Sequence, residues 1–278
     1  MNKSPLKWAG NKYKLLHHIL PHIGSPKRYC EPFGGSLSVA LNVYAKEYIL
    51  NDINRDLYYL YTNITHPFID EARALFNQEN NTRERYNQLK AEFNQTTDPK
   101  QRALLFLYLN KHGFNGLSRY NNKGEFNVPY GRECKNKATG VVTIQQSSFP
   151  EKELLNFFRF TYTCNVKFFN ESFDFPGLYE SLESGDVVYF DPPYVPLTTT
   201  SNFTQYTKED FTYENHIQLV ELGKSLSSRG IKVIVSNSDT DLTRELYNDA
   251  QIHTIQVQRN ISAKASSRGK VNELIAIY

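Results

Sequence analysis

Residues 31–35 are Glu31-Pro32-Phe33-Gly34-Gly35, and they end a strand-like run that begins at Lys27. Residues 36–44 have helical spacing, with one face made of Leu37, Ala40, Leu41 and Tyr44. Residues 48–52 form a second strand-like run that ends on Asp52. A strand, a glycine turn, a helix and a strand that closes on a carboxylate are typical of a nucleotide-binding βαβ unit. In such a unit the acid binds ribose hydroxyls, and the glycines let the ligand approach the backbone.

Further strand-like runs follow along the chain, with helical patterns between several of them. The runs are residues 166–169, 186–191, 232–236, 252–258 and 274–278, and the clearest helix spans residues 212–229. Alternating strands and helices favour an α/β fold with an open, mostly parallel sheet and helices on both faces.

An insertion separates the first strand from the fourth. From Glu31 to Asp191 is 160 residues, whereas three βα units need only about 75–90. The excess matches residues 55–150, which begin with helical stretches at 56–64, 68–76, 83–93 and 102–111. A basic, aromatic segment follows at 112–132, in which residues 120–126 resemble two short strands around a turn. We therefore expect one domain from residues 1–54 and 151–278, and a helical domain with a hairpin from residues 55–150.

The composition is that of a folded protein. Of the 278 residues 40% are hydrophobic and 14% aromatic, no apolar run approaches the ~20 residues of a membrane helix, and the first residues do not resemble a signal peptide. The three cysteines, Cys30, Cys134 and Cys164, have no metal-ligand spacing, so we expect reduced thiols in a cytosolic protein. The seven histidines are scattered, and we expect no metal site.

The net charge of +3 hides an asymmetry. Residues 1–14, 111–137 and 259–270 hold 14 basic residues and 2 acidic ones, whereas the rest of the chain holds 18 basic and 27 acidic residues. Basic charge confined to three stretches suggests contact with a polyanion. The alternative is that these stretches are solvated loops.

Asp191-Pro192-Pro193-Tyr194 directly follows the apolar run of residues 187–190. Proline fixes φ and has no N–H, so the carbonyl of Pro192 is held in one direction. That carbonyl and the Asp191 carboxylate are two acceptors, which suit the two donors of an exocyclic amine such as adenine N6 or cytosine N4, and Tyr194 can stack on the ring. The alternative is a strand that ends in a proline-rich turn.

These motifs together resemble the Dam-type DNA adenine-N6 methyltransferases. Residues 6–12, 31–35 and 191–194 are similar to signature blocks of that family, and so are residues 107–121, 124–131 and 271–274. Cofactor loop first, recognition insert second and Asp-Pro-Pro-Tyr third is the block order of the alpha group. The resemblance covers nearly the whole chain.

The resemblance implies a Rossmann-like S-adenosylmethionine-dependent methyltransferase sheet with a final antiparallel strand. The expected catalytic domain is residues 1–54 and 151–278, and the expected DNA-recognition domain is residues 55–150. The cofactor contacts that carry over are Trp8, Lys12, Phe33, Gly35, Asp52, Phe173 and Asp191. Trp8 and Lys12 would lie near the methionine part and Phe173 near the adenine ring. The family usually has a third glycine in the first loop, where this chain has Leu37.

The implied reaction is methyl transfer to N6 of an adenine flipped out of duplex DNA. Asp191 and the Pro192 carbonyl would bind the amine, and Tyr194 would stack on the base. Phe114 would be the wedge that fills the gap, unless it is a core aromatic. Arg119 and Lys7 would read guanines, with Asn115, Leu117 and Pro129 close to bases, and the implied site is GATC. Lys264, Arg268 and Lys270 would contact phosphates.

Other interpretations remain open. The same acceptors would serve cytosine N4 or an RNA adenine, and Leu37 would fit a regulator that binds DNA without catalysis. Asp191 argues against a protein-glutamine methyltransferase, in which Asn is common before Pro-Pro-Tyr. We expect a monomer that binds double-stranded DNA but no membrane or metal. Its expected location is cytoplasmic, in a bacterial cell near the nucleoid or encoded by a phage, with a role in replication-linked methylation or restriction-modification left open.

Overall fold

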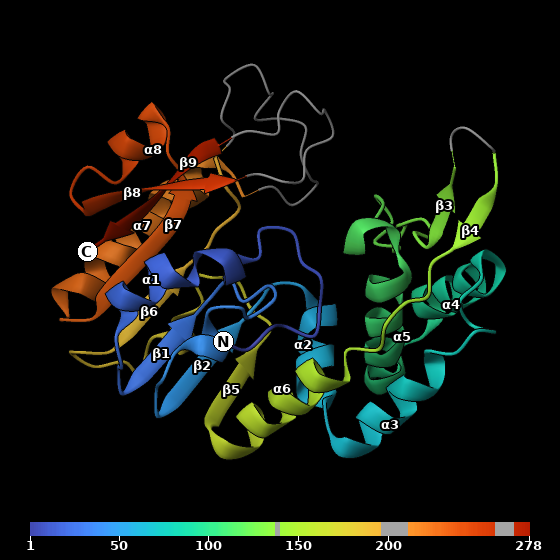
Figure 1. The fold of residues 1–278 in the computed structure, drawn as a ribbon. Helices are drawn as coiled ribbons and strands as arrows, with labels where there is room; N and C mark the ends of the chain where they lie inside the picture. Colours follow the sequence, from blue (N-terminus) through green and yellow to red (C-terminus); the bar gives the residue numbers. More distant parts are fainter. Residues whose placement is uncertain (137–139, 196–210, 259–269) are drawn as a thin grey trace. The chain divides into compact units, whose positions relative to one another are not determined.

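The computed structural model describes residues 1–136, 140–195, 211–258 and 270–278 (Figure 1). The chain forms two compact units. The helical unit consists of Met1–Tyr13, Gly35–Leu41 and Asn54–Cys164, and the sheet unit consists of Lys14–Gly34, Asn42–Ile53 and Asn165–Tyr278. The chain passes from one unit to the other between Gly34 and Gly35, within the glycine turn.

The sheet unit is built on a mostly parallel sheet with strand order β5-β2-β1-β6-β7-β9-β8. The first five strands in this order are parallel to one another, and β9 is antiparallel to both β7 and β8. The strands are β1 (Arg28–Glu31), β2 (Glu47–Asn51), β5 (Asn165–Phe169), β6 (Val187–Phe190), β7 (Lys232–Ser238), β8 (Gln251–Gln258) and β9 (Lys270–Ile277). This arrangement confirms the α/β fold class, including the antiparallel strand.

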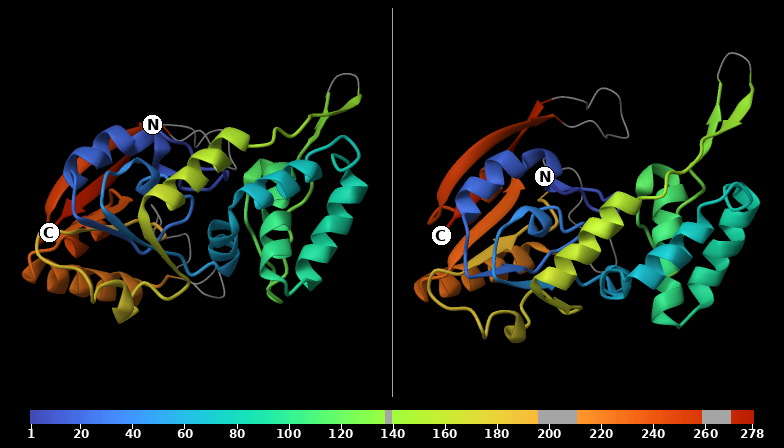
Figure 2. Two further views of the ribbon diagram at one scale, coloured as in Figure 1. Left: turned by 90° about the horizontal axis from the view of Figure 1, so that it is seen from below. Right: turned by 60° about the horizontal axis from the view of Figure 1, so that its bottom comes forward.

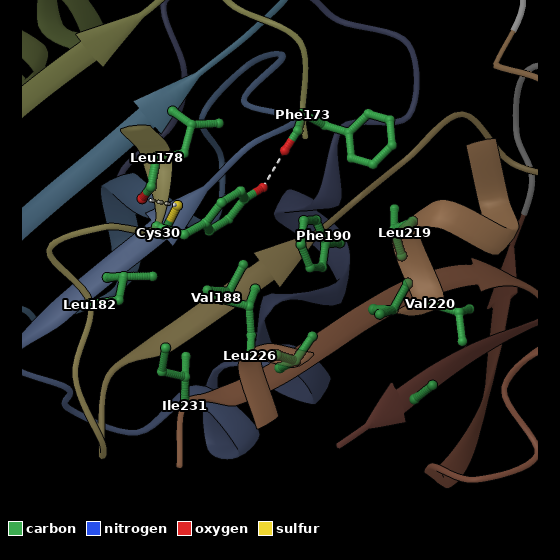
Figure 3. Packing of buried hydrophobic residues seen from close by; sticks show 14 of the residues in the cluster. Cys30, Phe173, Leu178, Leu182, Val188, Phe190, Leu219, Val220, Leu226 and Ile231 are labelled. Atoms are coloured by element: carbon green, nitrogen blue, oxygen red, sulfur yellow. Dashed lines mark hydrogen bonds between the residues drawn. The ribbon is translucent and has the colours of Figure 1, made fainter. Parts of the chain in front are cut away.

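Two helices, α1 (Leu16–Ile23) and α7 (Tyr213–Ser228), cover opposite faces of this sheet (Figure 2). Thr212 begins α7 with a capping box, in which its side chain and that of Asn215 satisfy each other's backbone N–H groups. Figure 3 shows how α7 packs through Leu219, Val220 and Leu226 in the same core as Phe190 of β6. Shorter elements complete the unit: η4 (Pro176–Leu178) and α8 (Asp241–Leu246). The central strands β2, β1, β6 and β7 are therefore buried on both faces, as the strands of parallel sheets usually are.

The helical unit is organised around α5 (Pro99–His112), whose residues from Leu105 to Asn110 are all buried. This helix packs against α2 (Arg55–Asn63), α3 (His66–Leu75) and α4 (Arg83–Gln95). The remaining elements are η1 (Lys12–Leu15), which crosses the unit boundary, η2 (Ala40–Asn42), η3 (Phe114–Gly116), β3 (Glu133–Lys135), β4 (Val142–Ile144) and α6 (Glu151–Thr163). The helices expected within residues 55–111 are confirmed.

The helix expected over residues 36–44 is wrong. Only the short η2 forms there, because Leu37 has a left-handed backbone with φ 55°, which a right-handed helix does not permit. Leu37, Ala40 and Leu41 are buried in an irregular loop, whereas Tyr44 is 79% exposed. The apolar residues of this stretch match helical spacing because the loop that carries them is buried on several sides.

The hairpin expected at residues 120–126 is smaller than predicted. It is a turn closed by one antiparallel bridge between Tyr120 and Phe126, with a backbone bond from Asn121 N to Glu125 O of 2.9 Å. The strands β3 and β4 pair antiparallel in residues 133–144, where the sequence predicted no strand. The two short strands predicted at residues 120–126 are therefore reduced to a single bridge.

No helix in the part of the chain that the structure describes is both long enough and apolar enough to cross a membrane. The three cysteines are free thiols, of which Cys30 is buried and Cys134 exposed.

A buried ion pair ties the turn to the helices. Arg102 of α5 donates to both carboxylate oxygens of Asp56 on α2, and the hydroxyl of Tyr120 donates to Asp56 as well. Arg102 also donates to the carbonyl of Phe93 at 3.0 Å and lies 4.2 Å from the centre of its ring. The Asp56 carboxylate therefore joins α2 to α5 and to Tyr120, the first residue of the turn at residues 120–126.

We expect Asp56→Ala to lower the free energy of unfolding by about 3–5 kcal/mol, because it leaves the buried Arg102 charge without its carboxylate. Urea denaturation followed by circular dichroism measures this change. The double variant Asp56→Leu/Arg102→Met is the control, and it should recover much of the loss because it removes both charges. An Asp56→Ala variant as stable as the parent protein would contradict a structural role for the pair.

Candidate functional site

The carboxyl ends of the parallel strands bring the sheet unit's candidate residues to one edge. Since β5, β2, β1, β6 and β7 run in the same direction, the segments that follow them leave the sheet at that edge. These segments carry Phe33, Asp52, Phe173 and the tetrad of residues 191–194. In open α/β sheets this is the edge where ligands bind.

The tetrad leaves the middle of the sheet. All four residues of β6 are buried, between β1 and β7. Asp191 is half-buried, Pro192 is buried and Tyr194 is half-buried. Burial, followed by the charges of Asp191 and Glu273, raises the pKa of Tyr194 well above its usual value. The phenol is therefore neutral and serves as a hydrogen-bond donor.

Two residues outside the tetrad hold it. The Tyr194 hydroxyl donates to Oε2 of Glu273 on β9 at 2.9 Å. The backbone N–H of Val195 donates to Oδ1 of Asn237 on β7 at 3.1 Å. Asn237 is fully buried and donates in turn to the Tyr247 hydroxyl at 3.1 Å. The segment after β6 is thus fixed to two neighbouring strands.

Aromatic rings gather next to the glycine turn. Phe33 and Phe173 stack with ring centres 5.4 Å apart and an interplanar angle of 23°. Phe211 lies edge-on to Phe33 at 5.5 Å and is 5.3 Å from Phe173. Because Phe33 and Phe173 are in contact, a planar ligand would lie against this group and not between those two rings.

The buried side chain of Asn51 connects three of the loops at this edge. Its amide nitrogen donates to the carbonyls of Pro32 and Glu171, at 2.9 and 3.0 Å, and its oxygen accepts from the N–H of Glu171 at 2.9 Å. Asn170 similarly donates to the carbonyl of Asp52 at 2.8 Å. The positions of Phe33, Asp52 and Phe173 therefore depend on these two amides.

The helical unit holds the other cofactor candidates, Trp8, Lys12 and Gly35. A Cβ atom on Gly35 would lie 2.8 Å from Nε1 of Trp8, and Gly35 has φ 48°, so only glycine fits at this position. Lys12 is buried and its ammonium donates to the carbonyl of Gly10 at 2.9 Å. Leu37, which stands where the resemblance implies a third glycine, has a left-handed backbone with φ 55°.

In the helical unit, Lys7 lies beside the basic, aromatic segment of residues 112–132, which is named the recognition region after its expected role. The side chain of Asn110 accepts from the N–H of Lys7 at 3.0 Å and donates to the carbonyls of Lys7 and Gly116, at 2.8 and 3.1 Å. Asn110 is fully buried on α5. Lys7 therefore lies beside residues that follow it by more than a hundred positions.

Five further DNA-binding candidates lie in the recognition region, on the two sides of the turn at residues 120–126. The N–H of Phe114 donates to the carbonyl of Pro129 at 2.9 Å, and Phe114 is 49% exposed, which argues against a core aromatic. Nε of Arg119 donates to Oδ1 of Asn127 at 2.7 Å. The structure brings together, within the helical unit, Lys7, Phe114, Asn115, Leu117, Arg119 and Pro129.

Burial weakens the basicity of several side chains in this part of the helical unit. Burial, together with the charge of Arg132, lowers the pKa of Lys7. Burial and then the charge of Lys7 lower the pKa of Lys111 to about 8, although Glu153 opposes the shift. Burial lowers the pKa of His112 to about 4, and the charges of Arg132 and Lys7 act in the same direction. His112 is therefore neutral near pH 7, and the Lys111 ammonium loses its proton more readily than that of a solvent-exposed lysine.

Comparison with known proteins decides the family. Residues 8–261 match the family described as D12 class N6 adenine-specific DNA methyltransferase. The chain belongs to this family. It is 44% identical to the DNA adenine methylase of Escherichia coli (strain K12) over 280 residues, which cover 100% of this chain and 95% of the relative. It is 42% identical to the DNA adenine methylase of Serratia marcescens, over 100% of this chain and 98% of that protein.

A further relative is the DNA adenine methylase of Vibrio cholerae serotype O1, at 41% identity over 98% of this chain and 95% of the relative. Among solved structures, the delta-N METTL16 MTase domain matches with a TM-score of 0.38 and 8% identity, over 95% of this chain and 80% of that chain. That likeness is too low to support an inference. The methyltransferase is therefore an enzyme that methylates adenine N6 in DNA, and a non-catalytic regulator is no longer a candidate.

The cofactor of the methyltransferase is S-adenosylmethionine. The residues of the sheet unit fit it: Asp52 follows β2, and the Phe33–Phe173 group offers an aromatic surface. Across the described stretches, no three histidine, cysteine, aspartate or glutamate side chains could hold a metal ion together.

Some candidates fall where the structure gives no side chain. Lys264 and Arg268 lie outside the described residues. For Lys270 only its position at the start of β9 is described.

The sequence did not single out Asn51, Glu273 or Asn237 as individual residues. Glu273 belongs to a block that resembles the family, so its place in the chain was noted but its contact was not. Nothing in the spacing of Asn51 distinguishes it from an ordinary polar residue at the end of a strand.

We expect Asn51→Ala to weaken S-adenosylmethionine binding by about tenfold or more, because it removes the hydrogen bonds that join the loops of Phe33 and Phe173. Isothermal titration calorimetry measures the affinity, and thermal denaturation measures the accompanying loss of stability. Asn63→Ala is the control, since Asn63 is an amide of the helical unit that donates to the carbonyl of Tyr59 at 2.8 Å. Unchanged cofactor affinity in Asn51→Ala would show that the loops hold their positions without this amide.

Proposed function

We propose that the methyltransferase acts on an adenine flipped out of duplex DNA, within the sequence GATC. The observation that supports this most is the tetrad Asp191-Pro192-Pro193-Tyr194 after the buried central strand β6, in a chain 41–44% identical to proteins named DNA adenine methylases. The basic recognition region of the helical unit supports a nucleic-acid substrate.

Asp191 and Pro192 make N6 reactive in this proposal. The lone pair of N6 is delocalised into the ring, so the amine is a poor nucleophile. The Asp191 carboxylate and the Pro192 carbonyl each accept one N6 hydrogen and draw the nitrogen toward tetrahedral geometry. Preorganised acceptors also stabilise the positive charge that develops on N6. The chemistry that S-adenosylmethionine supplies when bound is a methyl group on a positively charged sulfur.

Bound S-adenosylmethionine would supply the methyl group, and N6, held by Asp191 and the Pro192 carbonyl, would accept it. One N6 hydrogen then leaves as a proton along its hydrogen bond to Asp191 and passes to solvent. Holding the two reacting atoms in line is worth about 7–11 kcal/mol in well-oriented reactions.

The base must leave the helix before it can react, because N6 is unreachable within a duplex. Flipping costs a few kcal/mol, and stacking on an aromatic ring returns about 1–3 kcal/mol. We assign the stacking to Tyr194. Phe114, which is 49% exposed, is the residue assigned to the gap that the base leaves.

Each part of the cofactor is assigned to residues whose chemistry suits it. We assign the ribose hydroxyls to the Asp52 carboxylate and the adenine ring to Phe33 and Phe173. The methionine part is assigned to Trp8 and Lys12, and the absence of a side chain at Gly35 leaves room for the Trp8 indole, which lies 2.8 Å from where a Cβ atom would be.

Sequence reading belongs to the recognition region of the helical unit. Arg119 and Lys7 are the residues assigned to guanines, since Arg pairs with O6 and N7 in the major groove. Asn115, Leu117 and Pro129 are assigned to neighbouring bases. Lys264, Arg268 and Lys270 are assigned to phosphates, which fix position without reading sequence.

We also propose that the enzyme acts as a monomer in the bacterial cytoplasm, on nucleoid or phage DNA. The residues assigned to the cofactor, the flipped base and the guanines all come from one chain, and the DNA substrate determines the location.

We expect Asp191→Ala to abolish methyl transfer while DNA affinity stays close to that of the parent, because the carboxylate acts on the amine and not on the DNA backbone. Transfer of a labelled methyl group to a GATC duplex measures the reaction, and fluorescence anisotropy measures DNA binding. Asp191→Asn is the matched control, and it should also be slow because its amide supplies one acceptor without the charge. Turnover by Asp191→Ala would refute the role of this carboxylate.

We expect Arg119→Ala to relax discrimination at one base pair of GATC by about 1–3 kcal/mol. Methylation rates on duplexes that differ from GATC at single positions measure this change. Arg159→Ala, which removes an exposed arginine of α6, is the control and should leave discrimination intact. If Arg119→Ala instead weakens binding to every duplex equally, then Arg119 is a phosphate contact.

A further inference from the structure

A hydrogen bond crosses from the tetrad to the antiparallel strand of the sheet. The Tyr194 hydroxyl donates to Oε2 of Glu273 at 2.9 Å. We propose that Glu273 is a positioning residue for methyl transfer, whose carboxylate fixes the ring on which the flipped adenine stacks. The inference rests on the proposed stacking role of Tyr194.

The ring of Tyr194 is held at both of its ends. On the backbone side, the N–H of the next residue, Val195, donates to Asn237 at 3.1 Å, and the preceding Pro192 and Pro193 have fixed φ angles. On the other side the hydroxyl is bound to Glu273. A tyrosine side chain whose Cα and hydroxyl are both fixed cannot change its χ1 rotamer, so the ring stays in one place.

Glu273 is itself firmly placed. It lies on β9, which is paired on both sides, so that Glu273 is opposite Ser238 of β7 and Ile255 of β8. Its neighbour Asn272 accepts from the N–H of Asp239 at 3.2 Å. The strands β6, β7 and β9 are consecutive in the sheet, and the bond therefore reaches across β7 to the tetrad. A rigid acceptor makes this a suitable anchor for a ring that must meet a base.

The bond is of the stronger kind. An ionised acceptor shortens and strengthens a hydrogen bond relative to a neutral one, and burial with two neighbouring carboxylates keeps the phenol protonated. A stacked base gains from an aromatic face only when that face is already in position, because ordering a free ring on binding costs entropy. Fixing the ring in advance therefore favours the step in which the base is held beside the reacting groups.

Single-turnover methyl transfer tests the inference, with saturating S-adenosylmethionine and a duplex that the parent enzyme methylates. The variants are Glu273→Ala, Glu273→Gln, Tyr194→Phe, Tyr194→Ala and the double variant Tyr194→Phe/Glu273→Ala. We expect Glu273→Ala and Tyr194→Phe each to slow transfer by about tenfold with unchanged DNA affinity. The double variant should be no slower than either, because both changes remove one bond. Glu273→Gln should recover most of the rate, since its amide oxygen accepts the same hydrogen bond.

Glu183→Ala is the control for loss of a carboxylate in the same unit. Glu183 pairs with Arg28 at 3.0 Å, near the start of β1, and its removal should leave the transfer rate unchanged. A merely structural role for Glu273 would lower thermal stability in Glu273→Ala without slowing transfer at a temperature where the variant is folded.

The outcomes distinguish a failure of the proposed stacking role of Tyr194 from a failure of the positioning role of Glu273. If Tyr194→Ala transfers methyl groups at the parent rate, the stacking role in the proposed function is wrong. If Tyr194→Ala is slow but Glu273→Ala is as fast as the parent, Glu273 does not position the ring and the proposed function stands. Independent, additive losses in the double variant, or a Glu273→Gln variant as slow as Glu273→Ala, would also overturn the inference.

Discussion

The parallel pairing of β5, β2, β1, β6 and β7 is the constraint on which the catalytic chemistry depends. Parallel strands that are covered on both faces must send their carboxyl ends to one edge. The chain can therefore collect an aromatic loop, the acid proposed to bind ribose and the tetrad from three distant stretches without any of them being near in sequence. The covered strands themselves contribute no chemistry, but they determine where every one of these loops begins.

Buried asparagines give the loops their final positions. Asn51 and Asn237 in the sheet unit, and Asn110 in the helical unit, are each at most 3% exposed, and each joins backbone groups from separate segments. An amide carries two donors and two acceptor lone pairs in one small group, so a single side chain can satisfy backbone atoms of two loops at once. No charged residue could do so without a large desolvation penalty.

Much of this arrangement follows from the sequence, and the exceptions have physical causes. The strands were predictable because apolar runs with turn residues on both sides have few alternatives, and the helices of residues 55–111 because their apolar residues recur on one face. The failed helix at residues 36–44 lies in a buried loop, where apolar residues are required whatever the local structure. Asn51 and Glu273 could not have been found by spacing, since their hydrogen bonds join residues 120 and 79 positions apart.

Leu37 has a consequence for how such loops are recognised. Holding a leucine at φ 55° costs roughly 1–2 kcal/mol, and burying its side chain, which is 1% exposed, contributes about 1.5–3 kcal/mol. The two terms are similar, so a large apolar residue can take over a position usually reserved for the smallest one. Searches that demand three glycines in this motif would overlook such enzymes, whereas a criterion based on backbone handedness would retain them.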